Sequence, residues 1–302
     1  MDQNQGMGWV PDYPAISDYT TESNHVSSGK KELGQGDSVK AMLEKSGVVQ
    51  PEKLTLPIVV DLREWCSPIE NQESIGACTA HACVGIVEYF ERRAFGKHID
   101  ASRLFLYKTT RNLLHWTGDT GAFLRSTMGA LVLFGVPPEE YLPYVVADFD
   151  KEPSTFCYAF AQSFKAISYF RLDPMGITKD ALLTQIKANL SAGIPAMFGF
   201  TVYNSISQAE KTGKIPYPTA GEKIAGGHAI AAVGYDDNIK IKNTNPKATE
   251  TQGALLIRNS WGTGWGDGGY AWLPYDYVLK GLAVDWWALL KNEWIDTGEF
   301  KA

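Results

Sequence analysis

Hydrophobic and polar residues follow different patterns in the first 56 residues and in the rest of the chain. The first 56 are rich in Asp, Ser, Thr, Gly and Lys, and only residues 38–49 predict a helix. There Val39, Met42 and Leu43 share one face, and Asp37 is suited to cap the start. A segment this polar cannot hold a core alone. We therefore expect residues 1–56 to form a tail, a linker or an arm packed on the main body.

Beyond residue 56 the apolar patterns become stronger and change type along the chain. Residues 56–72 read as a β-type run followed by a turn, and helical periodicity covers 78–95, 124–135 and 179–193. Alternating or continuous apolar runs bounded by Gly, Asn, Asp and Pro predict strands at 165–172, 194–203, 228–235, 253–261 and 268–275. This order predicts an α+β fold with a mainly helical lobe at 57–163 and a mainly β lobe at 164–302.

Composition narrows the classes of function. With 302 residues, 44% of them hydrophobic, the chain can bury one large core or two halves that share a cleft. The net charge of −6 and the lack of a Lys/Arg block argue against a nucleic-acid partner. No apolar run approaches the roughly 18 residues that span a membrane. The first residues lack the basic start and apolar centre of a signal peptide.

The chain has four cysteines: Cys66, Cys78, Cys83 and Cys157. They are too few and too scattered for a disulfide scaffold, and no CxxC pair indicates a zinc site. We expect buried thiols, with one disulfide among Cys66, Cys83 and Cys157 as the alternative. No metal and no cofactor is expected.

One of these cysteines has the surroundings of a nucleophile. The run Ser74-Ile75-Gly76 interrupts the chain just before Cys78, which places this thiol in the first turn of a helix. Unpaired backbone N–H groups and the helix dipole favour a thiolate there. Cys83 lies more than one turn further into the same helix, where that effect has decayed. Cys78 is therefore the better candidate.

A thiolate needs a base, and His228 has the most suitable position among the five histidines. It follows two glycines at the head of an apolar strand, whereas His25 lies in the polar segment and His98 and His115 lie in loop-like surroundings. His81 is close to Cys78 along the helix but is expected to face away from the cleft. A rigid strand end is a sound support for a catalytic imidazole. A solvated or core histidine is the alternative interpretation.

A third element is the run RNSWGTGWGDGGY at 258–270, in which Asn259 ends a strand. Its amide oxygen can accept the imidazole N–H and fix the tautomer of His228. Trp261 can cover that contact and exclude water. The alternative is a glycine-rich loop with tryptophans that only pack.

Three segments together, NQESIGAC, GGHAIAAVGY and RNSWGTGWGDGGY, resemble the signatures of papain-type cysteine peptidases, family C1. The resemblance extends from about residue 56 to 275 and is stronger to the bacterial branch. It implies a two-lobed fold, with a helical lobe and a β-barrel-like lobe on either side of the active site. It also implies a cysteine endopeptidase that forms an acyl-thioester.

The resemblance assigns roles by motif. Cys78 matches the nucleophile, His228 the general base and acid, and Asn259 the orienting amide. Gln72 matches the donor that stabilises the oxyanion together with the Cys78 backbone N–H. The substrate-binding candidates are Gly121, Gly227 and Trp261.

Two positions depart from the family pattern. The family usually has a cysteine three residues before the nucleophile and an aromatic residue immediately after it, where this chain has Ile75 and Thr79. The usual disulfide of that loop is therefore absent. The spacing between His228 and Asn259 is longer than is common in the family, and the extra residues, 236–253, are expected to form a polar hairpin. The tail after Tyr275 has no counterpart in the family pattern.

The first 56 residues are expected to be an inhibitory pro-segment laid along or near the cleft, so that the chain is a zymogen. The alternative is a permanent structural arm. The expected partner is a peptide or protein substrate bound by a monomeric enzyme, and export is expected by analogy with digestive peptidases. Two other functions stay open: a catalytically silent relative that binds peptides or proteins, and a transglutaminase-like acyltransferase, which would use Asp as third member and lack the NSWGTGWG run.

Overall fold

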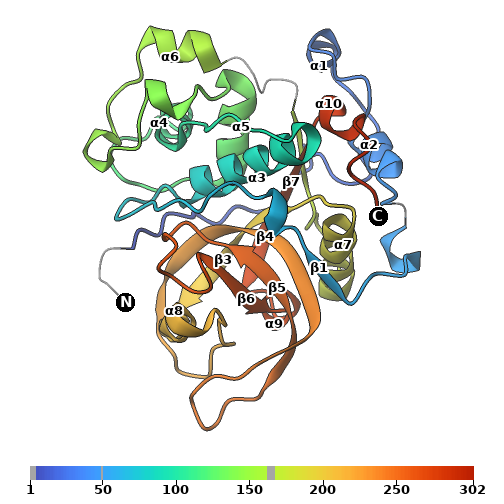
Figure 1. Ribbon diagram of the computed structural model, residues 1–302, viewed down its shortest axis with the longest axis vertical. Coiled ribbons are helices and arrows are strands. Elements are labelled where there is room, and N and C mark those ends of the chain that lie inside the picture. The colour runs from blue at the N-terminus through green and yellow to red at the C-terminus, as the bar shows by residue number, and fades with distance from the viewer. Residues whose placement is uncertain (1–4, 49, 162–166) are drawn as a thin grey trace.

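A computed structural model describes residues 5–48, 50–161 and 167–302. The expected lobe boundary between 163 and 164, the last position of the helix expected at 38–49, and residues 165–166 of the first expected strand lie outside the described residues. Most of the helices lie in the upper half of Figure 1 and most of the strands in the lower half. The chain is therefore α+β, as the sequence predicts.

The described helices and strands follow one another in an order that runs from mainly helical to mainly β. The α-helices are α1 (Ser28–Glu32), α2 (Val39–Lys45), α3 (Cys78–Phe95), α4 (Arg103–Leu113), α5 (Leu124–Phe134), α6 (Thr155–Phe160), α7 (Lys179–Ser191), α8 (Ala209–Thr212), α9 (Asp276–Leu279) and α10 (Asn292–Ile295). The strands are β1 (Val59–Asp61), β2 (Ser168–Arg171), β3 (Ala196–Tyr203), β4 (Ile224–Ile241), β5 (Thr251–Arg258), β6 (Tyr270–Pro274) and β7 (Ala283–Leu290).

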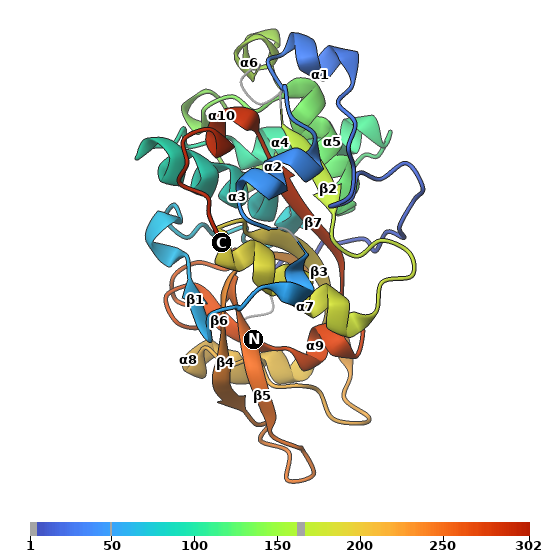
Figure 2. The same ribbon diagram turned by 90° about the vertical axis from the view of Figure 1, so that its right-hand side faces the viewer.

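These strands pair antiparallel in a single sheet of order β2-β7-β3-β4-β5-β6, with β1 added to β4. The long strands β4 and β5 stay paired as far as Ile241 and Thr251. Their extension confirms the hairpin expected at 236–253, and it projects at the bottom of Figures 1 and 2. Strand β7 was not predicted: its apolar run contains Asp285, and it lies in the interior of the sheet between β2 and β3.

Helix α3 forms the centre of the helical half and packs against β4. It begins at Cys78 and ends where Gly96 adopts a left-handed φ of 71° and donates its N–H to the Arg92 carbonyl. Every residue from Cys78 to Phe90 is buried, so this helix is covered on all sides. The predicted bounds, 78–95, are confirmed.

Helix α4 was missed, because its pattern places charge where a core would be apolar. Arg103, Lys108 and Arg111 are all buried in it. Each is neutralised by carboxylates that come from distant parts of the chain. Such partners are invisible to local periodicity, which explains the miss.

The polar first segment packs on the body through α2 (Figure 2). Val39, Met42 and Leu43 are buried in the core, as expected, but the helix spans only Val39–Lys45. Its cap is Ser38, whose hydroxyl accepts the Ala41 N–H. The expectation for Asp37 is wrong, since its carboxylate instead contacts Lys45 and Asn292 near the C-terminus.

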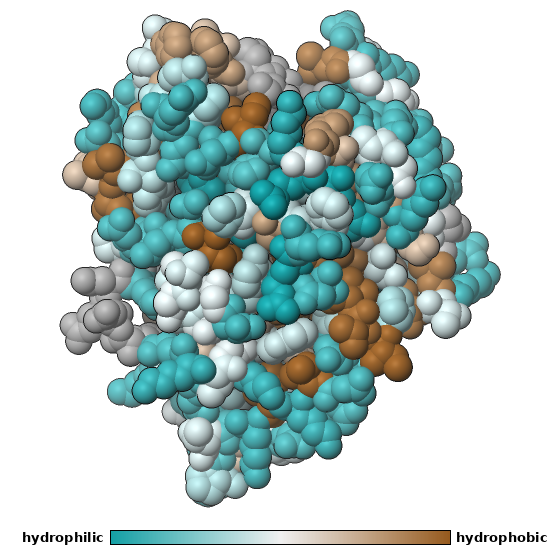
Figure 3. All heavy atoms as spheres, in the orientation of Figure 1, coloured by the Kyte–Doolittle hydropathy of each residue, from teal (hydrophilic) through white to brown (hydrophobic). Residues whose placement is uncertain are grey.

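Hydrophilic residues cover most of the face shown in Figure 3, and apolar residues form separate patches on it. None of the helices in the described part of the chain is long and apolar enough to cross a membrane.

Candidate active site

Cys78 lies at the start of α3, where the helical half meets the sheet. Its side chain has no exposed surface. The sulfur receives backbone N–H groups from Cys78 and Thr79 and, from strand β4, that of Ala229. Because Ala229 follows His228 directly, the strand brings the histidine backbone next to the thiol. The helix start therefore supplies the N–H groups that the sequence predicts.

His228 is held in one orientation by the residues after β5. Its Nε2 lies 2.8 Å from Oδ1 of Asn259, and that oxygen also accepts the Ser260 N–H. The indole of Trp261 stacks on the imidazole, with ring centroids 4.6 Å apart and planes 21° apart. The other nitrogen, Nδ1, is buried without a hydrogen-bond partner among the described residues. A proton on Nε2 leaves Nδ1 free to act as a base.

Gln72 is fixed against the same loop. Its backbone N–H donates to the carbonyl of Ser260, and its Oε1 accepts the Ser260 hydroxyl at 2.5 Å. Tyr144 adds a hydrogen bond to the Gln72 carbonyl. With Oε1 engaged, the amide Nε2 must point the other way, into the cleft. Ser260 was not among the predicted residues, although it belongs to the NSW motif.

Residues 6–10, here called the strap, run across this constellation. The carbonyl of Gly6 accepts a hydrogen bond from Gln72 Nε2 at 2.9 Å, and the Gly8 N–H reaches the sulfur of Cys78. The approach is very close: a Cβ on Gly8 would lie 2.0 Å from the carbonyl oxygen of Gly76. Only glycine fits there. The strap thus occupies both the thiol and the amide donor.

The strap is also paired with both walls of the cleft. On one side the Trp9 N–H donates to the Gly227 carbonyl at 3.3 Å. On the other, Ala122 donates to the Gly8 carbonyl at 2.8 Å and accepts the Val10 N–H at 3.0 Å, in a parallel bridge. These backbone contacts are of the kind that any extended peptide can make. The cleft is therefore lined for a peptide and holds one from the same chain.

The Trp9 side chain fills a pocket in the β half. An added Cβ at Gly199 would lie 1.8 Å from its ring, and its Nε1 donates to Asp285 at 3.0 Å. Asp285 is buried, has a left-handed φ of 59°, and also contacts Trp287 and Arg171. Burial raises the pKa of Asp285 to about 6, although the indole and Arg171 act in the opposite direction. Asp285 was missed, yet it is the one charge in the run AVDWWALL.

Burial under the strap shifts the pKa values of the Cys78 thiol and the His228 imidazole towards the neutral form of each group. Burial raises the pKa of Cys78 to about 11, against the lowering effect of the surrounding N–H groups. Burial also lowers the pKa of His228 to about 4, and the bond to Asn259 offsets this only in part. The position of Cys78 at a helix start predicts a lowered thiol pKa, but in the covered site the pKa of this thiol is raised. The physical reason is desolvation, which disfavours both charged forms.

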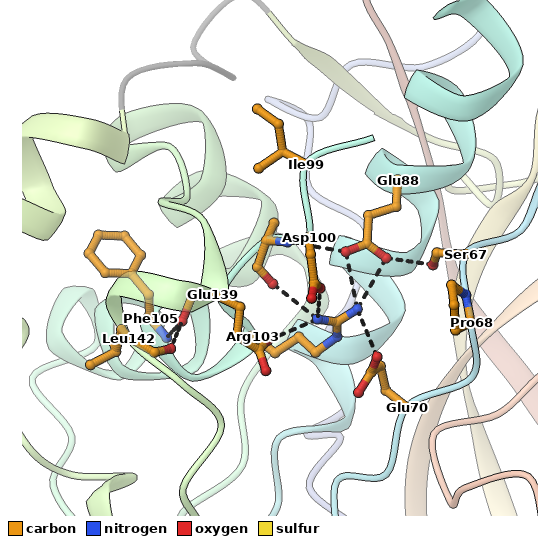
Figure 4. Close-up of polar contacts among 12 residues, drawn as sticks. Ser67, Pro68, Glu70, Glu88, Ile99, Asp100, Arg103, Phe105, Glu139 and Leu142 are labelled. Carbon is orange, nitrogen blue, oxygen red and sulfur yellow. Dashed lines mark hydrogen bonds and ion pairs between the residues drawn. The ribbon is translucent and has the colours of Figure 1, made fainter. Parts of the chain in front are cut away.

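A buried ionic cluster holds the segment that leads into Gln72. Arg103 on α4 is nearly inaccessible and contacts four carboxylates, as Figure 4 shows: Glu70, Glu88, Asp100 and Glu139. Glu88 on α3 also accepts the Ser67 hydroxyl. Residues 67–70 are thereby tied to two helices. Removing one partner of such a cluster would leave a buried charge uncompensated.

Not every predicted residue has the expected contacts. Gly121 has a φ of 70°, and its N–H is bound by the Tyr107 hydroxyl, so it does not pair with the strap. Its neighbour Ala122 makes that pairing, and sequence reasoning missed it. Gly227 and Trp261 both lie at the site. His81 packs edge-on against Tyr144 instead, away from the strap.

The remaining cysteines and acids hold no further site. Cys66, Cys83 and Cys157 are free and buried, so the alternative of a disulfide among them is wrong. Among the described residues there is no cluster of three or more His, Cys, Asp or Glu side chains that could hold a metal ion.

Comparison with known proteins supports the same family throughout. The family model described as papain family cysteine protease matches residues 56–281. Among curated proteins, a peptidase C1-like protein of Acanthamoeba polyphaga mimivirus is 32% identical over 237 residues, which cover 76% of this chain and 72% of the relative.

Two solved structures share the fold. Xylellain, a cysteine protease from Xylella fastidiosa, is 30% identical, with a TM-score of 0.71 over 96% of this chain and 98% of its own. The bromelain protease from Ananas comosus, at 20% identity and a TM-score of 0.56, covers 78% of this chain and all of its own. The chain therefore belongs to the papain family of cysteine proteases.

Proposed function

We propose that this protein is a cysteine endopeptidase with Cys78 as nucleophile, His228 as base and acid, and Asn259 as the orienting amide. The observation that carries the proposal is the 2.8 Å contact between His228 Nε2 and Asn259, which leaves Nδ1 buried and unpaired beside the strand that reaches Cys78. An imidazole fixed in this way can take the thiol proton.

The reaction follows from this arrangement. The Cys78 sulfur attacks the substrate carbonyl as its proton passes to His228, and the bond to the leaving amine breaks as His228 returns that proton. Gln72 Nε2 and the Cys78 backbone N–H stabilise the oxyanion. Loss of one such donor typically costs about 2.7–4 kcal/mol of barrier. Water then hydrolyses the thioester with the same residues.

We also propose that the strap makes this chain a zymogen. It uses the Gln72 amide that the oxyanion would need and covers the sulfur that would attack. It further removes water, which turns the expected thiolate and imidazolium into a neutral thiol and a neutral imidazole. A neutral thiol is a weaker nucleophile than a thiolate, so these pKa shifts add to the block on cutting the strap.

In the test, each active-site variant is made in two backgrounds: the full chain, and a Gly8→Ala chain in which the strap no longer fits. In the Gly8→Ala chain without further changes, we expect peptide hydrolysis and labelling of one cysteine by an epoxysuccinyl thiol reagent. Cys78→Ala should abolish both, an effect of about 10⁶-fold on turnover. Asn259→Ala should slow hydrolysis by about 10²–10⁴-fold without preventing labelling.

Cys83→Ala is the matched control, since Cys83 is an equally buried thiol of the same helix. It should retain hydrolysis and labelling. Full activity of Cys78→Ala would overturn the nucleophile assignment. Labelling of Cys78 with no hydrolysis of any peptide in a library would instead indicate a silent peptide-binding relative.

A further inference from the structure

The segment between the strap and the rest of the arm is unusually open. Residues 11–18, here called the loop, contain Tyr13 and Ile16, which are 86% and 94% exposed. They are the two most exposed large apolar side chains in the described part of the chain. Exposed loop tips of this kind are preferred sites of proteolytic cleavage.

Both ends of the loop are anchored while its tip is not. At one end Val10 pairs with Ala122, and at the other the Arg171 N–H donates to the Tyr19 carbonyl at 2.7 Å. Between them a turn closes from Ala15 to Asp18. For Ile16 and Ser17 no hydrogen bond occurs within the described ranges. On either side of this tip, Arg125 contacts the Tyr13 carbonyl and the Asp18 carboxylate. The stretch that a peptidase can reach without breaking an ion pair is therefore Ile16 and Ser17.

The arm beyond the loop is held in a different way. Val39, Met42 and Leu43 of α2 are buried in the core of the body, and each such side chain contributes about 1.5–3 kcal/mol by burial. The N–H of Ala302 donates to the Ser46 carbonyl, which ties this part of the arm to the C-terminal residues. A cut near residue 56 would leave this segment in place, with the strap still attached to it.

We infer that the loop is a proteolytic processing site, and that residues 19–56 stay with the mature enzyme as a structural part. The inference rests on the proposed zymogen. The cut is a hydrolysis within residues 14–18: water adds across one peptide bond, leaving a carboxylate on the strap side and an amine on the retained side. A second peptidase molecule performs it, because the strap occupies the cleft of its own chain.

Cleavage in the loop converts the strap from a tethered ligand into a free peptide. A tether supplies an effective concentration that is worth about 10²–10⁴-fold in apparent affinity. The strap is held by backbone hydrogen bonds and by the side chains of Met7 and Trp9, and the cut fragment also carries the ion pair of Asp12 with Arg125. Dilution after the cut releases it. The cleft then opens and Trp9 leaves the core, while α2 stays in place.

The experiment inserts the recognition sequence of a site-specific viral protease at one of two places in the full chain: after Ile16 in the loop, or after Thr55 at the end of the arm. Each purified chain is cut, checked by mass, and assayed for the rate of Cys78 labelling by an epoxysuccinyl reagent and for melting temperature. We expect the cut after Ile16 to raise the labelling rate by about 10²-fold or more, with only the modest fall in melting temperature that accompanies the loss of a bound ligand. The cut after Thr55 should leave labelling slow.

Equal labelling rates after the two cuts, or fast labelling only after the cut at Thr55, would overturn the inference. Fast labelling after the loop cut without peptide hydrolysis would refute the proposed peptidase function and leave the processing site standing. The unmodified chain provides an independent check: a trace of a broad-specificity protease should first produce new N-termini between Ala15 and Asp18. First cuts after residue 19 would contradict the inference.

Discussion

The strap at residues 6–10 and helix α2 belong to the same N-terminal arm and are both buried, but they are held by different forces. The strap is fixed by backbone hydrogen bonds, by glycines that allow close approach, and by Trp9 in its pocket. Helix α2 is fixed by apolar side chains in the core of the body. The first resembles a bound peptide ligand, and the second resembles any other core helix.

This difference indicates that only the strap acts as an inhibitor, although the strap and α2 both belong to the N-terminal arm. A net backbone hydrogen bond contributes only about 0.5–1.5 kcal/mol, and a competing peptide could replace those of the strap. Buried apolar side chains cannot be replaced in this way. Changes in α2 should therefore lower the free energy of unfolding without opening the site, whereas the main effect of changes in the strap should be to open the site.

The largest expected effect is on the α2 side. Met42→Ala should lower the free energy of unfolding by about 2–5 kcal/mol, because Met42 is fully buried and a cavity would remain. Urea denaturation measures this, and Ile16→Ala, at a 94% exposed position, is the control with a change within about 0.5 kcal/mol. The Cys78 labelling rate of the folded Met42→Ala chain should equal that of the wild type. An accelerated rate would mean that α2 also closes the site.

The next effect is on the strap side. In Gly8→Ala the new Cβ meets the backbone oxygen of Gly76, which cannot move aside cheaply. Such overpacking costs about 1–3 kcal/mol, so Cys78 labelling should accelerate by about 10- to 100-fold. Gly36→Ala is the matched control, since nothing lies within 4 Å of its Cβ position. Slow labelling of Gly8→Ala, as slow as in the control, would show that the strap does not limit access.

The parts of the molecule that could be predicted from the sequence are those specified by neighbouring residues. Helix α3 was predicted to the residue, because the break at 74–76 and the stop at Gly96 are local signals. The candidate residues Cys78, His228 and Asn259 follow from chemistry that is also local: a thiol at a helix start, and an imidazole and an amide at strand ends.

The strap was only expected somewhere near the cleft, because its fit depends on contacts such as Gly8 with Gly76, nearly 70 positions apart. Contacts between residues so far apart in the sequence do not appear in the local pattern of hydrophobic and polar residues. Helix α4 and strand β7 were missed for a similar reason: much of the compensation of the charges on Arg103 and Asp285 comes from groups in distant segments.

A smaller effect should separate the two parts of the Trp9 contact. Trp9→Phe keeps most of the apolar ring but loses the indole donor to Asp285. Loss of one hydrogen bond of about 0.5–1.5 kcal/mol should accelerate Cys78 labelling by about 2- to 10-fold. A double-mutant cycle with Asp285→Asn isolates the pair. Additive effects of the two changes would contradict a direct contribution of this hydrogen bond to strap closure.

A further difference should appear in the pH dependence of two acids that contact the arm, Asp285 at Trp9 and Asp37 beside α2. Burial raises the pKa of Asp285 above its usual value, to about 6, so the folded state binds its proton more tightly than the unfolded state. Stability from this group is therefore lost as pH rises from about 4 to about 6, at no more than about 1.4 kcal/mol per pH unit. In Asp285→Asn this loss should be absent. When the free energy of unfolding is plotted against pH, the curves of wild type and variant should therefore converge or cross between about pH 4 and about pH 6.

Asp37, beside α2, should behave in the opposite way. Its hydrogen bond with Lys45 lowers its pKa, in spite of partial desolvation. Its contribution is present above the pKa of an unfolded aspartate, near 3.9, and is lost only as pH falls further. Because about a quarter of the Asp37 side chain is exposed (26%), solvent screening keeps the effect below about 1 kcal/mol. Asp37→Asn should leave the slope of unfolding free energy against pH unchanged between about pH 4 and about pH 6. A slope altered as much as in Asp285→Asn would contradict the distinction between the strap pocket and the α2 surface.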